Sequence, residues 1–135
     1  MRAVFDANVV ASAVCWNGEA YRCFVKLARR QIFAFGTIET LEEASDITPH
    51  LIHTENPRHN ATARLNWYLE KVKMVDAAPL GRQRSRDAKD DPCLAAAVAA
   101  RADFIVSYDK DLLELGKPFG IEIIRPMQFL KRIKG

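Results

Sequence analysis

The chain has 135 residues, 49% of them hydrophobic and 27% charged, and carries a formal net charge of +3. These values predict one globular domain over residues 1–135, and they exclude a disordered chain and a strongly basic nucleic-acid-binding domain. The longest uncharged run, residues 7–18, is too short to span a bilayer and we expect no secretory signal, so the predicted location is the cytoplasm, with no membrane partner.

Strand and helix patterns alternate along the whole chain. Short apolar runs indicate buried strands, and apolar residues at helical spacing indicate amphipathic helices. The predicted elements are a strand at 3–5, a helix at 19–30, a strand at 32–35, helices at 37–47 and 60–72, a strand at 74–78, a helix at 92–100, a strand within 103–109, a short helix at 112–116, a strand at 121–124 and a terminal helix at 126–133. This order predicts an α/β fold, with a parallel sheet of about five strands covered by helices on both faces.

The ends of two predicted helices carry specific signals. Asp91 stands where an N-cap belongs, Pro92 suits the first helical position, and residues 94–100 are almost wholly apolar. These features predict a buried helix. Gly116 is expected to end the short helix that follows the strand within 103–109.

The cysteines and histidines do not match a common metal or disulfide pattern. The cysteines are odd in number and contain no CxxC pair, which predicts buried free thiols. The histidines share one polar region, but their spacing fits no common metal motif. These residues are Cys15, Cys23 and Cys93, and His50, His53 and His59.

Acidic residues recur where predicted strands end, and this is the edge of an open α/β sheet that carries the functional crevice. They are Asp6 after the first strand, Glu42 and Glu43 on the helix at 37–47, Asp91 at the start of the helix at 92–100, and Asp109 and Asp111 after the strand within 103–109. Converging carboxylates repel one another, so such a site must raise some pKa values or bind a cation. Mg²⁺ prefers oxygen ligands and can activate water against a phosphodiester, so the pattern predicts hydrolysis of nucleic acid.

Each acid also has a purely structural explanation. Asp91 could act only as an N-cap, which is worth about 1 kcal/mol. Asp109 and Asp111 could begin the short helix, and the two glutamates could lie on a solvated face. Asp6 is the hardest to explain in this way, because a carboxylate at the end of a buried strand is costly to desolvate without a partner.

The ordered motifs "FDANV", "ETLEEA" and "DPCLAAAVAARADFIVSYDKDLL" resemble those of the PIN-domain nucleases, in particular the toxins of type II toxin–antitoxin systems. The resemblance covers nearly the whole chain. It implies a PIN-like three-layer α/β/α sandwich and a ribonuclease that depends on Mg²⁺ or Mn²⁺. It also implies an RNA substrate, a cognate antitoxin that blocks the acidic crevice with a basic side chain, and a homodimer.

The resemblance further implies a four-acid site. The catalytic acids would be Asp6, Glu43, Asp91 and Asp109, of which Asp6, Asp91 and Asp109 would ligate the metal. Glu42 remains an alternative to Glu43, because a helical wheel places Glu42 nearer the apolar stripe. The supporting residues would be Asn8, Ser107, Asp111 and Glu42, with Asp87 and Asp90 in a polar rim and Arg82, Arg84 and Arg86 along the approach to the site, where they would contact substrate.

The chain has Ser107 and Tyr108 where members of this group often have Thr and Gly. A hydroxyl group is therefore retained at the first of these positions. The bulky ring at the second position is expected to narrow access to the site.

Two other readings compete. A receiver-like phosphoacceptor domain also places acids at strand ends, and Asp6, Asp76, Ser107 and the pair Arg125–Pro126 loosely match its pattern. It needs paired acids after the first strand and a lysine after the last, which this chain lacks. The other alternative is a catalytically silent PIN-fold module that binds RNA or protein. Loss of one of the four acids would favour that reading, and none is missing.

Overall fold

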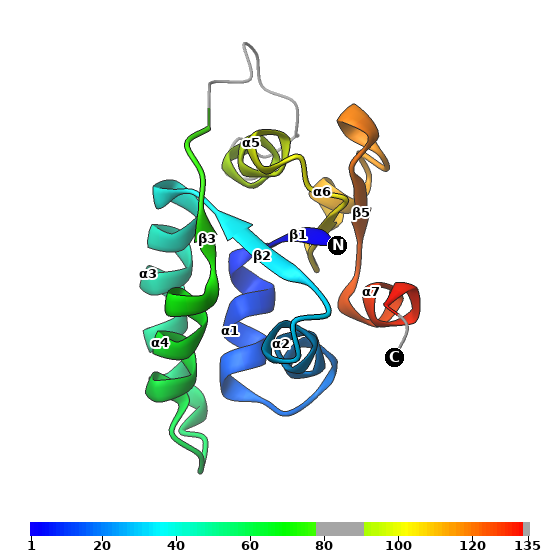
Figure 1. Ribbon diagram of the computed structural model, residues 1–135. Coiled ribbons are helices and arrows are strands. Elements are labelled where there is room, and N and C mark those ends of the chain that lie inside the picture. Colours follow the sequence, from blue (N-terminus) through cyan, green and yellow to red (C-terminus); the bar gives the residue numbers. More distant parts are fainter. Residues whose placement is uncertain (78–90, 134–135) are drawn as a thin grey trace.

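The computed structural model describes residues 1–77 and 91–133, and its centre is a five-stranded parallel sheet (Figure 1). The strands are β1 (Arg2–Phe5), β2 (Phe33–Gly36), β3 (Lys73–Met74), β4 (Phe104–Val106) and β5 (Glu122–Ile124). The helices are α1 (Ala7–Cys15), α2 (Glu19–Ala28), α3 (Ile38–Glu55), α4 (Ala61–Lys71), α5 (Asp91–Ala100), α6 (Lys110–Leu113) and α7 (Pro126–Arg132), and a 3₁₀ helix, η2, spans Pro118–Gly120. The predicted α/β fold is confirmed.

The sheet has the strand order β3-β2-β1-β4-β5, so β1 is central. Val4 of β1 is level with Phe35 on one side and with Ile105 on the other, and all pairings are parallel. All five strands therefore end at the same edge of the sheet. The receiver alternative is excluded, because receiver domains have the order 2-1-3-4-5 and place their third strand in the centre, whereas Asp76 here follows an edge strand.

Successive strand residues face opposite sides of the sheet, and this alternation creates two cores. Ala3 and Phe5 belong to the core that α1, α2, α4 and α7 cover, whereas Val4 belongs to the core that α5 covers. In the first core the rings of Phe24 and Tyr68 stack with centroids 4.8 Å apart. Both core faces are thus covered by helices, as a three-layer sandwich requires.

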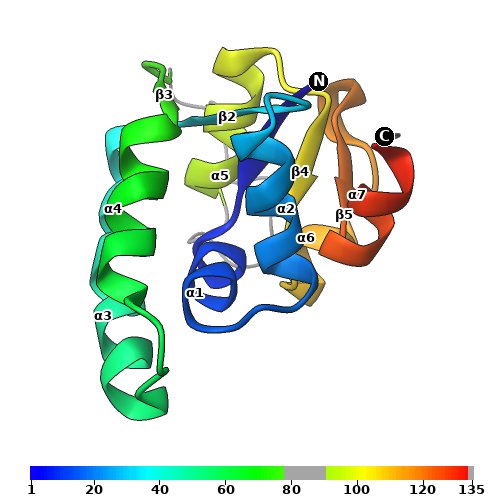
Figure 2. The same cartoon turned by 60° about the horizontal axis from the view of Figure 1, so that its bottom comes forward.

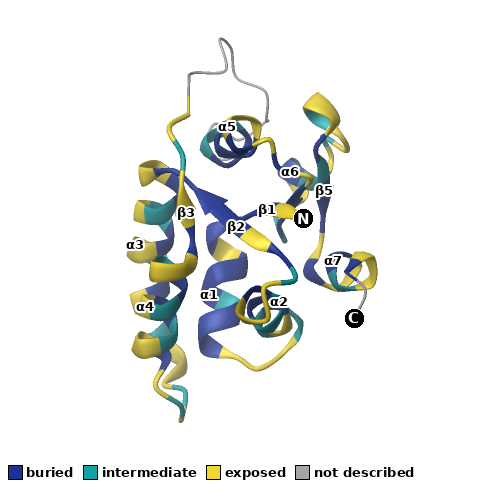
Figure 3. Cartoon of the chain, viewed as in Figure 1, coloured by how far each residue is buried: buried dark blue, intermediate teal, exposed yellow. Residues whose placement is uncertain are grey.

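The two views of the ribbon show how the helices flank the sheet. Helices α3 and α4 lie side by side at one end of the sheet, and α7 lies at the other end (Figures 1 and 2). Strands β1, β2, β4 and β5 and helix α1 are mostly buried, whereas β3 is exposed and α3 and α4 expose their outer faces (Figure 3). None of the helices in the described ranges combines the length and the apolar composition that crossing a membrane would require.

Helix α1 was not among the predicted elements. Seven of its nine residues are buried. A helix that is apolar on nearly every side shows no amphipathic period, and its run of alanine and valine gives no contrast between two faces. The pattern therefore predicted the strand before Asp6 but not the helix after it.

Other boundaries also differ from the predicted ones. Helix α3 continues to Glu55 rather than residue 47, because Thr48 is fully buried and Asn56 ends the helix in a left-handed conformation (φ 44°). Strand β3 covers only Lys73–Met74 and not 74–78; residue 78 lies outside the described ranges. The short helix is Lys110–Leu113 rather than 112–116, because Asp109 caps it.

Candidate active site

Asp6 is the one buried carboxylate among the described residues, and it lies where β1 ends and α1 begins. Only 8% of the residue is exposed. Its Oδ1 accepts a hydrogen bond from the backbone N–H of Ala7 (2.8 Å), and its Oδ2 accepts one from the Ser107 hydroxyl (2.7 Å). The carboxylate therefore has a fixed orientation between the central strand and its neighbour.

Ser107 connects this carboxylate to Asp109. It follows β4, and the register that pairs Phe5 with Val106 brings Ser107 level with Asp6. Its Oγ donates to Asp6 and accepts from the backbone N–H of Asp109 (2.9 Å), so a single buried hydroxyl joins both acidic segments. The predicted supporting role of Ser107 thus has a geometric basis.

Asp109 caps helix α6. Its Oδ1 accepts hydrogen bonds from the backbone N–H groups of Asp111 (2.8 Å) and Leu112 (3.4 Å). Asp109 is half-buried, and its charge acts on Asp6. The structural explanation of Asp109 as a helix cap is confirmed, but the cap also places its charge beside a second carboxylate.

The electrostatics of Asp6 are unfavourable for a charged group. Burial is the main cause that raises the pKa of Asp6, and the negative charge of Asp109 raises it further; the bonds from Ser107 and Ala7 act in the opposite direction. No lysine or arginine within residues 1–77 and 91–133 forms an ion pair with either carboxylate. The chain therefore leaves the negative charge of this pair unbalanced in the described part.

Asp91 and Glu43 lie on helices that start at the same edge of the sheet. Helix α5 packs against β1, β2 and β4 and leads directly into β4, so its first residue, Asp91, lies toward the edge where the strands end. Asp91 is the first helical residue rather than the cap that precedes it. Helix α3 begins at Ile38, and its N-cap, Thr37, directly follows β2. Both acids are half-buried.

The two glutamates differ in burial, and this corrects the helical wheel. The buried side of α3 carries Thr40, Ala44 and Thr48. Glu42 is exposed, whereas Glu43 is half-buried beside Ala44. Glu43, and not Glu42, is thus the less exposed of the two side chains. Burial favours Glu43, and its catalytic role stays a prediction.

The other predicted site residues have less defined positions. Asn8 is exposed in the first turn of α1, and Asp111 lies in the first turn of α6 with its N–H bonded to Asp109. The predicted substrate-binding arginines and rim acids, Arg82, Arg84, Arg86, Asp87 and Asp90, lie outside the described residues. The cysteines are buried and free, as predicted.

The described residues do not contain a group of three or more His, Cys, Asp or Glu side chains close enough to hold a metal ion. The structure brings together two of the four predicted acids, Asp6 and Asp109. Asp91 and Glu43 are placed at the same edge of the sheet by the positions of α5 and α3. The four-acid site as a whole therefore stays a prediction.

Tyr108 has a contact that the sequence did not predict. Its hydroxyl donates to Oε1 of Glu19 at the start of α2 (3.0 Å), and its ring packs against the core that contains Phe5. The ring is thus held toward α2, and whether it narrows access to the acids stays a prediction. The positive charge of Arg125 also acts on the Tyr108 phenol.

Comparison with known proteins agrees with this fold. The chain matches the PIN domain family over residues 2–111. Its structure is similar to the crystal structure of PAE2754 from Pyrobaculum aerophilum, with a TM-score of 0.63 and 17% sequence identity over 98% of this chain and 89% of that chain. No curated protein sequence matches. At this identity the structural similarity concerns the fold alone.

Proposed function

Because the chain belongs to the PIN domain family, which has a nuclease fold, we propose that it is an endoribonuclease that depends on Mg²⁺ or Mn²⁺. One observation carries the proposal: the buried Asp6 and the nearby Asp109 are joined through Ser107 at the edge where the strands end. In α/β sheets this edge is where ligands bind. The unbalanced negative charge suits a cation as ligand.

The two acids fit a hard divalent ion. Mg²⁺ is usually held by only one or two carboxylates, while waters and substrate phosphates complete its coordination. Asp6 and Asp109 would hold the ion, with Asp91 as a further ligand and Glu43 as the fourth acid of the site. When bound, the ion would lower the pKa of a water molecule and neutralise charge on the phosphodiester.

The chain's own contribution is to keep the acceptor oxygens in place. The single Ser107 proton is donated to Asp6, which fixes the plane of that carboxylate. The backbone donors of α6 hold Oδ1 of Asp109, and no hydrogen bond from the described ranges reaches its Oδ2. Such preorganised groups need not reorient when a charged ligand arrives.

We also propose that the protein is the toxin of a toxin–antitoxin pair. The motifs that resemble those of PIN toxins support this role, together with an antitoxin partner and a homodimer. Such a toxin would act on RNA in the cytoplasm. The silent-module alternative has less support, because all four acids of the motif are present.

An RNA cleavage assay tests the enzymatic proposal. Wild type and Asp6→Asn are compared in Mg²⁺, in Mn²⁺ and in chelator. Asparagine caps a helix as well as aspartate does, but it is a poorer ligand for Mg²⁺. We expect cleavage to fall on the order of 10²-fold or more in the variant and to disappear in chelator.

Asp103→Asn is the matched control. Asp103 is exposed at the opposite edge of the sheet, where its Oδ2 accepts the backbone N–H of Arg2. This variant should cleave RNA like wild type. Undiminished cleavage by Asp6→Asn, or cleavage in chelator, would overturn the proposed function.

A second pair of variants decides between the adjacent glutamates. We expect Glu43→Gln to lower the cleavage rate about tenfold, the size typical of a lost group around a metal site, and Glu42→Gln to change it less than about twofold. The rates are measured under the same Mg²⁺ conditions. The reverse result would assign the fourth acid to Glu42.

A further inference from the structure

An open groove of about 690 Å³ runs along β5, the edge strand beyond β4. Residues of α6, the segment after it, β5 and the start of α7 line it. Three of its lining residues are the exposed cations Lys110, Lys117 and Arg125. None of the three forms an ion pair with an acid of the described ranges. The groove is therefore a candidate site for an anion.

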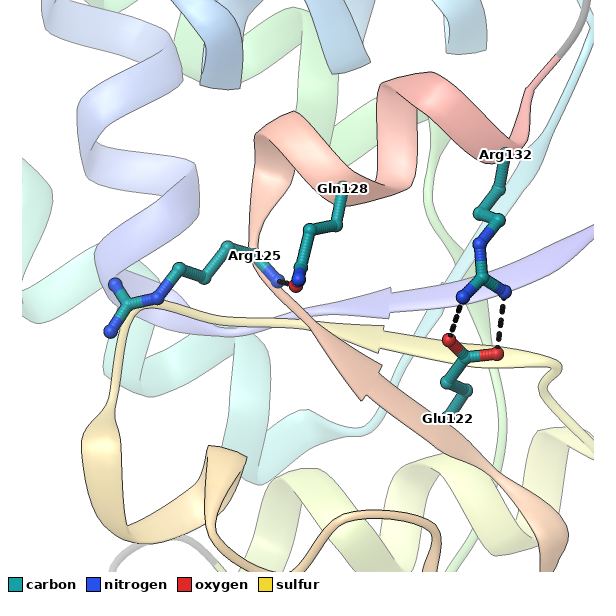
Figure 4. Close-up of polar contacts among 4 residues, drawn as sticks. All are labelled: Glu122, Arg125, Gln128 and Arg132. Atoms are coloured by element: carbon teal, nitrogen blue, oxygen red, sulfur yellow. Dashed lines mark hydrogen bonds and ion pairs between the residues drawn. The ribbon is translucent and has the colours of Figure 1, made fainter.

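The acidic side chains of the groove oppose this charge only in part. Glu122 lines the groove but pairs with Arg132, through Oε1 to Nη1 (2.7 Å) and Oε2 to Nη2 (2.6 Å). Figure 4 shows this bidentate ion pair and the Arg125 guanidinium, which extends away from it. Glu114 is the other acid that lines the groove. With Glu122 neutralised, the cations outweigh the acids.

The groove begins next to the candidate active site. Arg125 directly follows Ile124, whose backbone carbonyl accepts the N–H of Ser107 (3.0 Å). Lys110 directly follows Asp109. The charge of Arg125 acts on Tyr108, and Figure 4 shows its guanidinium beside the loop that follows β4. Two cations that form no ion pair with an acid of the described residues thus flank the segment that carries Ser107 and Asp109.

We propose that this groove binds the phosphate backbone of single-stranded RNA next to the bond that is cleaved, with Arg125 and Lys110 as positioning residues. The inference rests on the proposed function and adds the path of the substrate. A polyanion suits the site, because the groove is open and three exposed cations line it, one of which, Lys110, is next to Asp109 in the chain. Arginine can also bind a phosphate group through two parallel hydrogen bonds.

The first experiment measures binding alone. A fluorescent single-stranded RNA is titrated in chelator at several salt concentrations, with wild type and with the double variant Arg125→Gln, Lys110→Gln. For single strands, each lost phosphate contact makes the negative slope of log K against log salt less steep by about 0.7. The slope of the double variant should therefore be less steep than that of wild type by about 1.4. We expect its affinity to fall about tenfold at moderate salt.

The second experiment measures cleavage of the same RNA in Mg²⁺. A positioning role predicts a KM raised about tenfold, while kcat changes less than about twofold. Arg29→Gln is the control, because Arg29 is an exposed cation at the end of α2, at the opposite edge of the sheet. It should reproduce wild type in both experiments, and all variants should unfold at the wild-type temperature.

The outcomes separate the two proposals. If wild type cleaves RNA and the double variant keeps the wild-type salt slope and KM, the groove proposal is wrong and the nuclease stands. If wild type binds RNA through the groove but does not cleave it, the proposed function is wrong and the groove stands. The same titration is repeated with an acidic polypeptide in place of RNA. If the double variant loses binding to the polypeptide while its RNA binding is unchanged, the RNA proposal is wrong.

Discussion

At the two ends of helix α1, side chains of opposite charge bind the backbone groups that have no partner within the helix. At the C-terminal end, Nη1 of Arg64 donates to the carbonyls of Ala13 (3.0 Å) and Trp16 (3.2 Å), and Nε2 of His59 lies 2.7 Å from the carbonyl of Val14. At the N-terminal end, the carboxylate of Asp6 accepts the first N–H of the helix. Each charge has the sign that the helix dipole favours at its end.

The difference lies in what surrounds the two charges. The Arg64 guanidinium stacks over the Tyr21 ring (4.1 Å) and binds several carbonyls, so the chain itself satisfies it. Asp6 is buried and faces a second carboxylate, without a cation from the described residues. One end of the helix is arranged for stability. The other keeps a charge that no cation of residues 1–77 and 91–133 balances.

The largest expected loss of stability comes from the C-terminal end. Arg64→Met keeps much of the aliphatic volume but removes the donors to the last carbonyls of α1. We expect the free energy of unfolding to fall by about 2 kcal/mol, because hydrogen bonds to charged groups are lost at a helix end. Denaturant unfolding measures this change.

Arg58→Met is the matched control for this prediction. Arg58 is exposed shortly before α4, and its replacement should alter the free energy of unfolding by less than about 0.5 kcal/mol. RNA cleavage per folded molecule should be the same for both variants and wild type. A folded Arg64→Met protein with impaired cleavage would contradict the division of roles between the two ends.

A smaller loss of stability, with a loss of cleavage, is expected at the N-terminal end. Ser107→Ala removes the donor to Asp6 and the acceptor of the Asp109 N–H. We expect the free energy of unfolding to fall by about 1 kcal/mol and the cleavage rate about tenfold. Ser45→Ala, at an exposed position of α3, should change neither quantity. If Ser107→Ala loses stability but cleaves like wild type, the hydroxyl does not orient the acids.

Local patterns were sufficient for most strands of the sheet, although β3 overlaps the strand predicted at 74–78 only at Met74. The apolar run that ends at Asp6, and the run that ends before Ser107, predicted two parallel strands whose ends meet. That was enough to expect Asp6 and Asp109 at one edge. The two hydrogen bonds of the Ser107 hydroxyl could not be predicted, because they depend on the register between β1 and β4. No local pattern fixes that register.

Contacts between segments that are distant in the chain could not be predicted from the sequence either. Arg64 caps a helix that ends some fifty positions earlier, and its amphipathic surroundings on α4 gave no signal of that partner. The groove cations gave no signal either. Arg125 entered only through the receiver alternative, and its place beside Tyr108 follows from strand order. The sequence thus predicted types of element and their ends, while cross-strand partners came from the fold.

The smallest expected effect concerns the charge of Asp6 itself, measured on metal-free protein in chelator. Because burial raises the pKa of Asp6 above its usual 3.8, the folded state binds a proton that the unfolded state releases. This contribution to stability is therefore full below pH 3.8 and is lost as the pH rises through the raised pKa. Asp6→Asn has no such loss, so its unfolding temperature relative to wild type should increase over that range.

At neutral pH, Mg²⁺ should stabilise wild type relative to Asp6→Asn, which is the reverse of the difference expected in chelator. This measurement compares the two helix ends most directly. An ion that binds only the folded state stabilises it by about 0.4 kcal/mol at a concentration equal to its Kd, and by about 1.4 kcal/mol at ten times that concentration. Wild type and Arg64→Met should gain this increment, and Asp6→Asn should not. An equal gain in all three proteins would mean that the ion binds elsewhere and that Asp6 keeps its buried charge without it.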